Sequence, residues 1–191
     1  KNLYKSFGEK GVLSDISFSL SKGQAVAIVG KSGAGKSVLL KCLIGLLKPD
    51  KGTIYVDNKL INSMSFSQLQ EIRASIGMVF QFGALFDSLT VRDNISLALR
   101  KLTKLSEDKI QERVINSLES VDMANTEDLM PAELSGGMKK RVGIARAIAI
   151  EPAYLFYDEP TTGLDPVMTD SINRLICKFQ STEKVTSVII T

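Results

Sequence analysis

Two kinds of hydrophobic pattern follow each other along this chain. Near its start, Ile16, Phe18 and Leu20 alternate with serines, which is the two-residue period of a half-buried antiparallel strand, and Gly8–Gly11 before them predicts a turn. We therefore expect two or three short strands here. Farther on, Ala25–Val29 is a continuous apolar run bounded by turn residues, which predicts a strand buried on both faces of a parallel sheet.

The next elements alternate between helix and strand. Strands are predicted at Thr53–Asp57, Ile76–Phe80, Ala153–Tyr157 and Val185–Thr191, and helices at Lys36–Ile44, Gln68–Ala74, from Ser135–Gly137 to Ile150, and Val167–Gln180. Between residues 82 and 134 the pattern is helical, because apolar residues recur at helical spacing from Ile110 to Val121 behind a predicted cap at Ser106. Strands that alternate with helices are typical of an α/β protein with a parallel sheet.

Composition narrows the class of protein. The 191 residues are 44% hydrophobic and 24% charged, which is ordinary for a globular domain, and no apolar run approaches the roughly 20 residues of a membrane helix. The net charge of +3 is small and evenly spread, so we expect no nucleic-acid partner. Cys42 and Cys177 lie far apart in apolar segments, so we expect core residues in a reducing compartment rather than a disulfide. The absence of histidine excludes histidine-based catalysis within these residues.

A glycine-rich segment predicts a phosphate site. Gly30–Ser37 matches G-x-x-x-x-G-K-[ST] completely and lies between a predicted strand and a predicted helix. Its glycines let successive N–H groups face a phosphate, and the helix N-terminus adds positive potential. Lys36 is expected to reach the β- and γ-phosphates, and the Ser37 hydroxyl to bind Mg²⁺. The expected phosphate-binding residues are Gly30, Lys31, Ser32, Gly33, Ala34, Gly35, Lys36 and Ser37.

Two acidic residues end a predicted buried strand. Asp158 and Glu159 follow the apolar run Tyr154–Tyr157, at the carboxyl end where open α/β sheets bind their ligands. Two adjacent acids are by themselves more often a solvated strand end. Together with the phosphate loop, they predict a Mg²⁺ ligand at Asp158 and a group that polarises the attacking water at Glu159.

Several motifs together resemble those of ABC-type ATPases. Leu134–Met138, followed by Asp158–Glu159, resembles the signature and Walker B motifs of that family. Gln81 resembles the Q-loop glutamine, Thr162–Asp165 resembles the D-loop, and Phe7 lies where the adenine-stacking aromatic residue is usual. The resemblance spans essentially the whole chain, and five motifs in order are far more specific than any one of them.

The resemblance implies a fold and a division of the chain. The expected fold is an α/β P-loop NTPase with a RecA-like parallel-sheet core, an N-terminal antiparallel β subdomain and a helical insert. A single domain is expected over residues 1–191, with the β subdomain and core in 1–81 and 136–191 and the helical subdomain in 82–135. Because the chain begins without Met and ends in an apolar β-type run, we also expect truncation at both ends.

The resemblance also implies an assembly and a set of site residues. Two copies are expected to bind head to tail, with ATP between the phosphate loop of one and Ser135–Gly137 of the other. The implied catalytic residues are Glu159, Lys36 and Gln81; the Mg²⁺ ligands are Ser37, Gln81 and Asp158; further nucleotide contacts are Phe7, Ser135, Gly136, Gly137 and Asp165. Met138 departs from the usual glutamine, and no histidine follows the terminal strand. This chain is therefore expected to bind ATP yet to hydrolyse it poorly.

One branch of the family is the most similar. Phe80–Val91, Leu134–Met138 and Lys139–Arg141 resemble the ATPase subunit of Mla-type phospholipid transporters, which work with MCE-domain proteins. The implied role is a motor for lipid transport, bound to a permease at the cytoplasmic face of the inner membrane. The residues expected to form a groove for a permease helix are Phe82, Leu85, Phe86 and Leu89, with core packing as the alternative. Lys139–Arg141 are expected to form a solvated helix face, with phosphate steering second.

Other functions stay open from the sequence. The cargo could be a small solute such as an amino acid, because importers share much of the same pattern. A non-transport ABC ATPase is disfavoured by the single cassette without heptads or a metal cluster. A regulatory module that binds nucleotide without turnover is disfavoured by Lys36, Asp158 and Glu159, although the missing histidine keeps it open for this chain.

Overall fold

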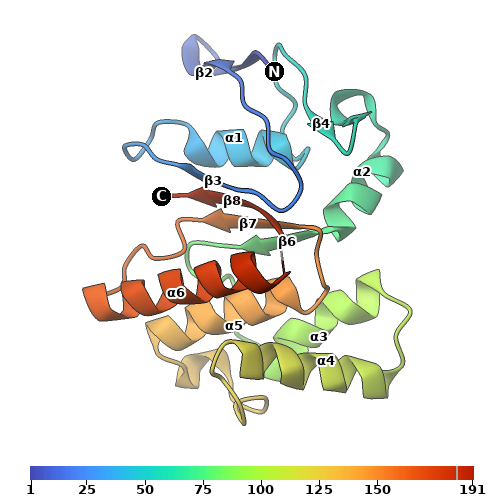
Figure 1. The fold of residues 1–191 in the computed structure, drawn as a ribbon, viewed down its shortest axis with the longest axis vertical. Helices are drawn as coiled ribbons and strands as arrows, with labels where there is room; N and C mark the ends of the chain where they lie inside the picture. The colour runs from blue at the N-terminus through green and yellow to red at the C-terminus, as the bar shows by residue number, and fades with distance from the viewer. Residues whose placement is uncertain (184) are drawn as a thin grey trace.

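A four-stranded parallel sheet lies at the centre of the protein (Figure 1). The structure is a computed structural model that describes residues 1–183 and 185–191. In spatial order the strands are β3 (Ala25–Ile28), β8 (Thr186–Ile190), β7 (Tyr154–Asp158) and β6 (Ile76–Val79). All three pairings are parallel, so the carboxyl ends of the strands lie at one edge, on the left in Figure 1.

Helix α1 (Lys36–Leu43) covers one face of this sheet and joins it to a second layer. Its buried Leu40 packs with Phe156 and Val188 of the sheet. Its Leu39 and Cys42 pack instead with Leu3 and other residues of the outer strands. Those outer elements are β1 (Leu3–Phe7) and β2 (Lys10–Ile16), which form an antiparallel hairpin, and β4 (Tyr55–Val56) and β5 (Lys59–Leu60), which form another.

Helices cover the opposite face of the sheet. They are α5 (Gly136–Ile148) and α6 (Pro166–Glu183), with α3 (Val91–Leu102) and α4 (Glu107–Ser120) beyond them (Figure 1). One hydrophobic cluster runs through this layer, from Val79 and Leu155 of the sheet to Ile95 and Leu118 of α3 and α4. The smaller elements are η1 (Ile61–Ser63), α2 (Phe66–Ala74) and η2 (Pro131–Glu133). The predicted α/β class with a parallel sheet and an antiparallel strand pair is confirmed.

Three expectations about local structure are wrong. The alternation from Ile16 to Leu20 is not a strand, because β2 ends at Ile16 and the chain then runs without a strand to β3. Residues Ala25–Ile28 are not buried on both faces, because β3 pairs on one side only, with β8, and its residues alternate between exposed and half-buried. Cys42 is buried as expected, whereas Cys177 is exposed on the outer side of α6.

Nothing in the described part of the chain spans a bilayer. Within residues 1–183 and 185–191, every helix is too short or too polar to cross a membrane.

Candidate functional site

The loop between β3 and α1 is built around left-handed glycines. Gly33 and Gly35 have φ of 78° and 89°, a region that glycine enters without a steric penalty. A Cβ on Gly35 would lie 2.8 Å from Val12 Cγ1 and 2.9 Å from Val12 O, so this glycine also lets the loop rest against β2. The result is the curled backbone that the phosphate-loop pattern of Gly30–Ser37 predicts.

Lys36 is buried beneath this loop. Its Nζ donates hydrogen bonds to Gly30 O at 2.6 Å and to Lys31 O at 3.3 Å. The same Nζ lies 3.6 Å from Glu159 Oε1, across the sheet edge. The loop thus holds its cation inward, at the position from which an ammonium group can meet phosphate oxygens.

Asp158 and Ser37 face each other at the carboxyl end of β7. The Ser37 hydroxyl donates to Asp158 Oδ1 at 3.3 Å. Partial burial raises the pKa of Asp158, and the hydrogen bond from Ser37 opposes that shift. A hydroxyl and a carboxylate are hard oxygen ligands, which is the donor chemistry that suits Mg²⁺. The pair therefore fits the predicted metal site.

Glu159 lies at the centre of a hydrogen-bonded cluster. Its Oε2 accepts from Gln81 Nε2 at 3.0 Å and from the Thr162 hydroxyl at 3.1 Å. Its φ of 47° is in the left-handed region, which non-glycine residues adopt seldom and which is often found at functional sites. Gln81 is predicted as both a catalytic residue and a metal ligand. In the structure its side-chain amide donates a hydrogen bond to the Glu159 carboxylate.

Lys140 belongs to this cluster, although the sequence analysis placed it on a solvated face. It is only 5% exposed, and its Nζ donates to the backbone carbonyls of Gln81 and Thr162. Burial lowers the pKa of Lys140, and the nearby charge of Glu159 opposes the shift. A signal was available in the sequence: Lys140 is three residues after Gly137 and four before Ile144, on the stripe of α5 that faces the core.

Arg146, five residues after Arg141 on α5, also holds the segment after Gln81. Its guanidinium donates to Gly83 O and Ala84 O, both at 2.7 Å. Arg141 is half-buried and bonds to Val121 O, so it too differs from the solvated face that was predicted.

The predicted signature residues lie at the start of α5. Ser135 is the N-cap, and its Oγ accepts a hydrogen bond from Met138 N at 3.3 Å. Ser135 and Gly136 are exposed, and a Cβ on Gly136 would meet open space. Gly137 is buried, and a Cβ there would lie 1.8 Å from Met168 Cε. The start of α5 is therefore accessible from solvent at Ser135 and Gly136, where the first N–H groups of a helix have no partner within the helix.

Two further predicted nucleotide contacts have other partners in this structure. Asp165 Oδ1 accepts hydrogen bonds from Val167 N and Met168 N, both at 2.9 Å, so its carboxylate caps the first turn of α6. Phe7 ends β1 and is half exposed, with Lys5 Nζ 5.5 Å from its ring centroid. The ring of Phe7 is therefore reachable from solvent.

The aromatic residues after Gln81 are on the surface. Phe82 is 75% exposed and Phe86 is 54% exposed, so core packing is ruled out for both. Leu85 is partly buried and packs against the core, and Leu89 is half-buried. Large exposed apolar side chains close together are typical of contact surfaces.

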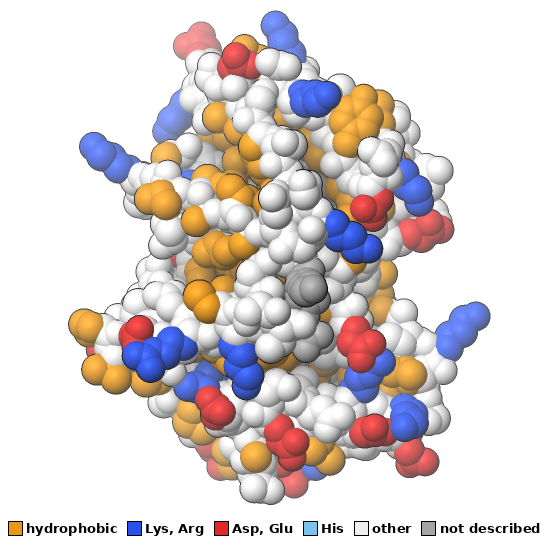
Figure 2. Space-filling model, viewed as in Figure 1, with side chains coloured by type: hydrophobic (Ala, Val, Ile, Leu, Met, Phe, Trp, Pro, Cys, Tyr) orange, Lys and Arg blue, Asp and Glu red, His pale blue; other side chains and the backbone are white. Residues whose placement is uncertain are grey.

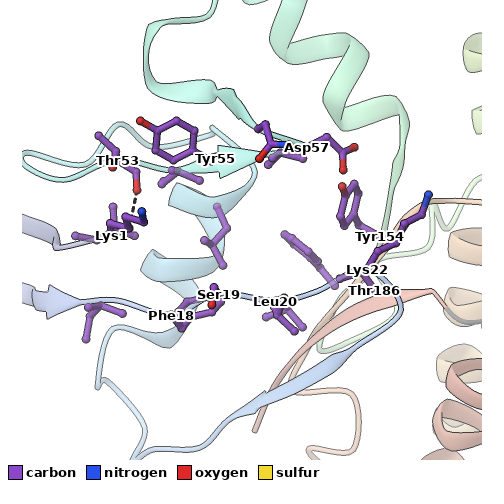
Figure 3. A pocket seen from close by; sticks show the side chains of 18 residues that line it. Lys1, Phe18, Ser19, Leu20, Lys22, Thr53, Tyr55, Asp57, Tyr154 and Thr186 are labelled. Atoms are coloured by element: carbon purple, nitrogen blue, oxygen red, sulfur yellow. Dashed lines mark hydrogen bonds between the residues drawn. The ribbon is translucent and has the colours of Figure 1, made fainter.

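A cavity of about 420 Å³ lies away from this cluster, between the outer strands and the sheet (Figure 3). Its lining includes Phe18, Leu20, Tyr55 and Tyr154, whose phenol lies beside Asp57. Burial and Asp57 raise the pKa of Tyr154 to about 12. On the face drawn in Figure 2, hydrophobic side chains gather left of the centre, and charged side chains lie across the lower part of the face as well as along its outline. No acid, base or cation of the phosphate-loop cluster lines this cavity.

The fold and the cluster define a P-loop nucleotide-binding α/β protein. The sequence profile described as "ABC transporter" matches residues 13–162. The chain therefore belongs to the ABC transporter family, as the motifs predicted.

Relatives and solved structures agree with this assignment. The chain is 45% identical over 96% of its length to "Protein TRIGALACTOSYLDIACYLGLYCEROL 3, chloroplastic" of Arabidopsis thaliana, covering 55% of that protein. It is 39% identical over its whole length to "Intermembrane phospholipid transport system ATP-binding protein MlaF" of Haemophilus influenzae, covering 72%. It is 41% identical over its whole length to "Methionine import ATP-binding protein MetN" of Brucella abortus, covering 52%.

A solved structure supports the fold directly. The ATP-binding cassette MJ0796, in a dimeric post-hydrolysis state bound to ADP and Pi, matches the whole chain and 86% of its own length with a TM-score of 0.90 and 33% identity. The chain spans about half the length of the first plant and mycobacterial relatives it matches.

Proposed function

We propose that this chain is the ATP-binding and ATP-hydrolysing subunit of an ABC transporter. The observation that carries the proposal is the cluster at the carboxyl edge of the sheet, where Lys36 lies 3.6 Å from Glu159 and Ser37 lies 3.3 Å from Asp158. Residues from three separate strand ends meet there, each with the chemistry that phosphoryl transfer needs.

Each side chain of the cluster has a defined task in the proposed reaction. The N–H groups of Gly30–Ser37 and the Lys36 ammonium bind the phosphates of ATP and neutralise their charge. Ser37 and Asp158 hold Mg²⁺, which supplies positive charge to the phosphates when it is bound. Glu159 accepts a proton from the attacking water, and Gln81 orients the Glu159 carboxylate through its 3.0 Å hydrogen bond.

The exposed start of α5 supports a dimer of two such chains. Ser135 and Gly136 are exposed at the start of a helix, which suits a γ-phosphate bound by a second copy. We propose a head-to-tail homodimer in which Ser135–Gly137 of one copy completes the ATP site of the other, with Phe7 stacking on adenine and Asp165 near the shared nucleotide.

For the cargo we propose phospholipid moved between membranes. The proposal rests on the segment around the exposed Phe82 and Phe86 and on likeness to an ATP-binding protein of an intermembrane phospholipid transport system. In this proposal Phe82, Leu85, Phe86 and Leu89 receive a helix of an integral membrane permease. The chain then lies at the cytoplasmic face of the inner membrane, and an MCE-domain lipid-binding protein is a further partner of the complex.

A small-solute importer is the second candidate. It is favoured by the 41% identity to a methionine import ATP-binding protein, which is as high as the identity to the phospholipid system. The residues of the nucleotide site do not distinguish the two cargoes, because in this proposal they bind ATP and not the cargo. Identity alone therefore leaves the two cargoes open.

Affinity purification separates the two candidates. The full-length protein with Glu159→Gln, which is expected to hold Mg-ATP in a stable dimer, is purified from its native membranes with Mg-ATP, and co-purified proteins and lipids are identified by mass spectrometry. A permease with an MCE-domain protein and bound phospholipid supports lipid transport. A permease with a solute-binding protein and no enriched lipid supports the importer. As a matched pair, Phe82→Ser with Phe86→Ser should lose the permease, whereas the exposed Phe66→Ser on α2 should keep it.

A further inference from the structure

One buried cation holds both residues that orient Glu159. Gln81 Nε2 and Thr162 Oγ1 donate to the same carboxylate oxygen, Glu159 Oε2, at 3.0 and 3.1 Å. The backbone carbonyls of the same two residues, Gln81 and Thr162, both accept from Lys140 Nζ. Glu159, Gln81, Thr162 and Lys140 thus form a closed set of hydrogen bonds. The side chains of Gln81 and Thr162 donate to Glu159, and their backbone carbonyls accept from Lys140.

The burial of Lys140 makes these two hydrogen bonds costly to lose. The side chain is 5% exposed, so its ammonium group has few routes to water. A buried ammonium needs hydrogen-bond acceptors, and the carbonyls of Gln81 and Thr162 supply two of them. Lys140, Gln81 O and Thr162 O therefore stabilise one mutual geometry, and displacement of any of them breaks the set.

We propose that Lys140 is a positioning residue for ATP hydrolysis, which fixes the Glu159 carboxylate by holding the main chains of Gln81 and Thr162. It touches neither ATP nor the attacking water in this scheme. The inference rests on the proposed function, because it assigns a role within the same reaction. It predicts an effect on turnover that is separate from nucleotide binding, since the phosphates are held by the Gly30–Ser37 loop.

The test compares three substitutions of Lys140 in the full-length protein assembled with its permease. Lys140→Met keeps the length of the side chain but donates no hydrogen bond, Lys140→Gln offers an amide with two hydrogens, and Lys140→Arg offers a charged fork. A misplaced general base loses about 10- to 100-fold in rate, so Lys140→Met should lower kcat by that factor. KM and the affinity for Mg-ATP should stay within about threefold of wild type, because the residues that bind the phosphates are unchanged. Lys140→Arg and Lys140→Gln should each recover part of kcat.

Two controls separate positioning from a general effect on folding. Lys178→Met removes an exposed lysine from α6 and should leave kcat unchanged. In a protein that already carries Gln81→Ala and Thr162→Val, Lys140 has nothing left to position, so Lys140→Met should then lower kcat by less than about threefold. Thermal unfolding of each variant reports whether the fold is intact.

The outcomes are distinct. A wild-type kcat in Lys140→Met overturns the inference while the ATPase function stands. A loss of nucleotide affinity in parallel with kcat, without recovery by Lys140→Arg or Lys140→Gln, also overturns it, because that pattern indicates a structural role alone. A wild-type complex that neither binds nor hydrolyses ATP refutes the proposed function, and this inference falls with it.

Discussion

Asn94 should be one of the most sensitive polar positions outside the nucleotide site. It lies on α3, is 1% exposed, and its Oδ1 accepts from Phe86 N at 2.7 Å. Its Nδ2 lies within 3.0 to 3.1 Å of three carbonyl oxygens, those of Phe86, Leu89 and Thr90. One side chain therefore fixes the loop that presents the exposed ring of Phe86.

The cost of removing this side chain follows from its hydrogen bonds. An NH₂ group has two hydrogens, so its three contacts amount to two full hydrogen bonds, and the bond from Phe86 N adds a third. At about 1 kcal/mol net for each bond, Asn94→Ala should lower the free energy of unfolding by about 3 kcal/mol. Asn94→Asp should cost at least as much near neutral pH, because a carboxylate cannot donate and would face three carbonyl oxygens.

Urea unfolding followed by circular dichroism measures this loss. The midpoint should fall at an unchanged m-value, and amide exchange at Phe86 should become faster. Asn116→Ala is the matched control, because Asn116 is exposed on α4, and its effect should stay within about 0.5 kcal/mol. A loss below about 1 kcal/mol for Asn94→Ala would show that the loop is held by other contacts, and the reasoning would be refuted.

Three further predictions follow from single contacts. Gly77→Ala should destabilise the fold by about 1–3 kcal/mol in urea unfolding, because a Cβ there would lie 2.4 Å from Ala147 O; a neutral result would mean that α5 can shift away from β6. Lys36→Ala should abolish ATP binding in calorimetry, and an unchanged affinity for ATP would contradict the assignment of Gly30–Ser37 as a phosphate loop. Burial raises the pKa of Asp158, so the folded state disfavours its charged form, and stability is lost as pH rises above the ordinary value of about 3.9. Asp158→Asn should therefore raise the Tm of the nucleotide-free protein at about pH 7 but not at about pH 3, and an equal change at both values would contradict this assignment.

The parts of the fold that the sequence predicted are those with local causes. The phosphate loop depends on glycines at fixed spacing, and the structure has Gly33 and Gly35 in the left-handed region. Helix α1 begins at Lys36 and the chain turns at Gly45 after it, where φ is 68°. In these segments the same residues carry the pattern and form the turn, so no distant contact was needed to predict them.

The failures have tertiary causes. The alternation at Ile16–Leu20 is as regular as that of a strand, yet whether a strand forms depends on a partner strand, which the pattern does not contain. The burial of Ala25–Ile28 depends on the position of β3 at the edge of the sheet. An edge strand and a central strand can have the same apolar composition, so the order of strands had to come from the structure.

The largest gap concerned the role of basic residues on α5. In sequence, Lys139–Arg141 is a charged run of the kind that usually lies on a solvated face. In the structure, Lys140 reaches two main-chain carbonyls, and burial is tolerated because both bonds are made. Acceptors from residues far away along the chain cannot be read from the helix itself. In the sequence, only the position of Lys140 on the core-facing stripe of α5 indicated that it is buried.

Helix α5 contacts both the segment that carries the exposed Phe82 and the residues that surround Glu159. Its Lys140 and Arg146 hold carbonyls of Gln81, Gly83 and Ala84, and a Cβ on Gly143 would lie 3.2 Å from Gly83 Cα. The segment that carries the exposed Phe82 cannot slide along α5 without breaking these bonds or opening that contact. The segment that carries the exposed rings is thus bonded to α5 and, through the side chain of Gln81, to Glu159. In the proposed function, a displacement of this segment by a permease would therefore disturb the hydrogen bond that orients Glu159.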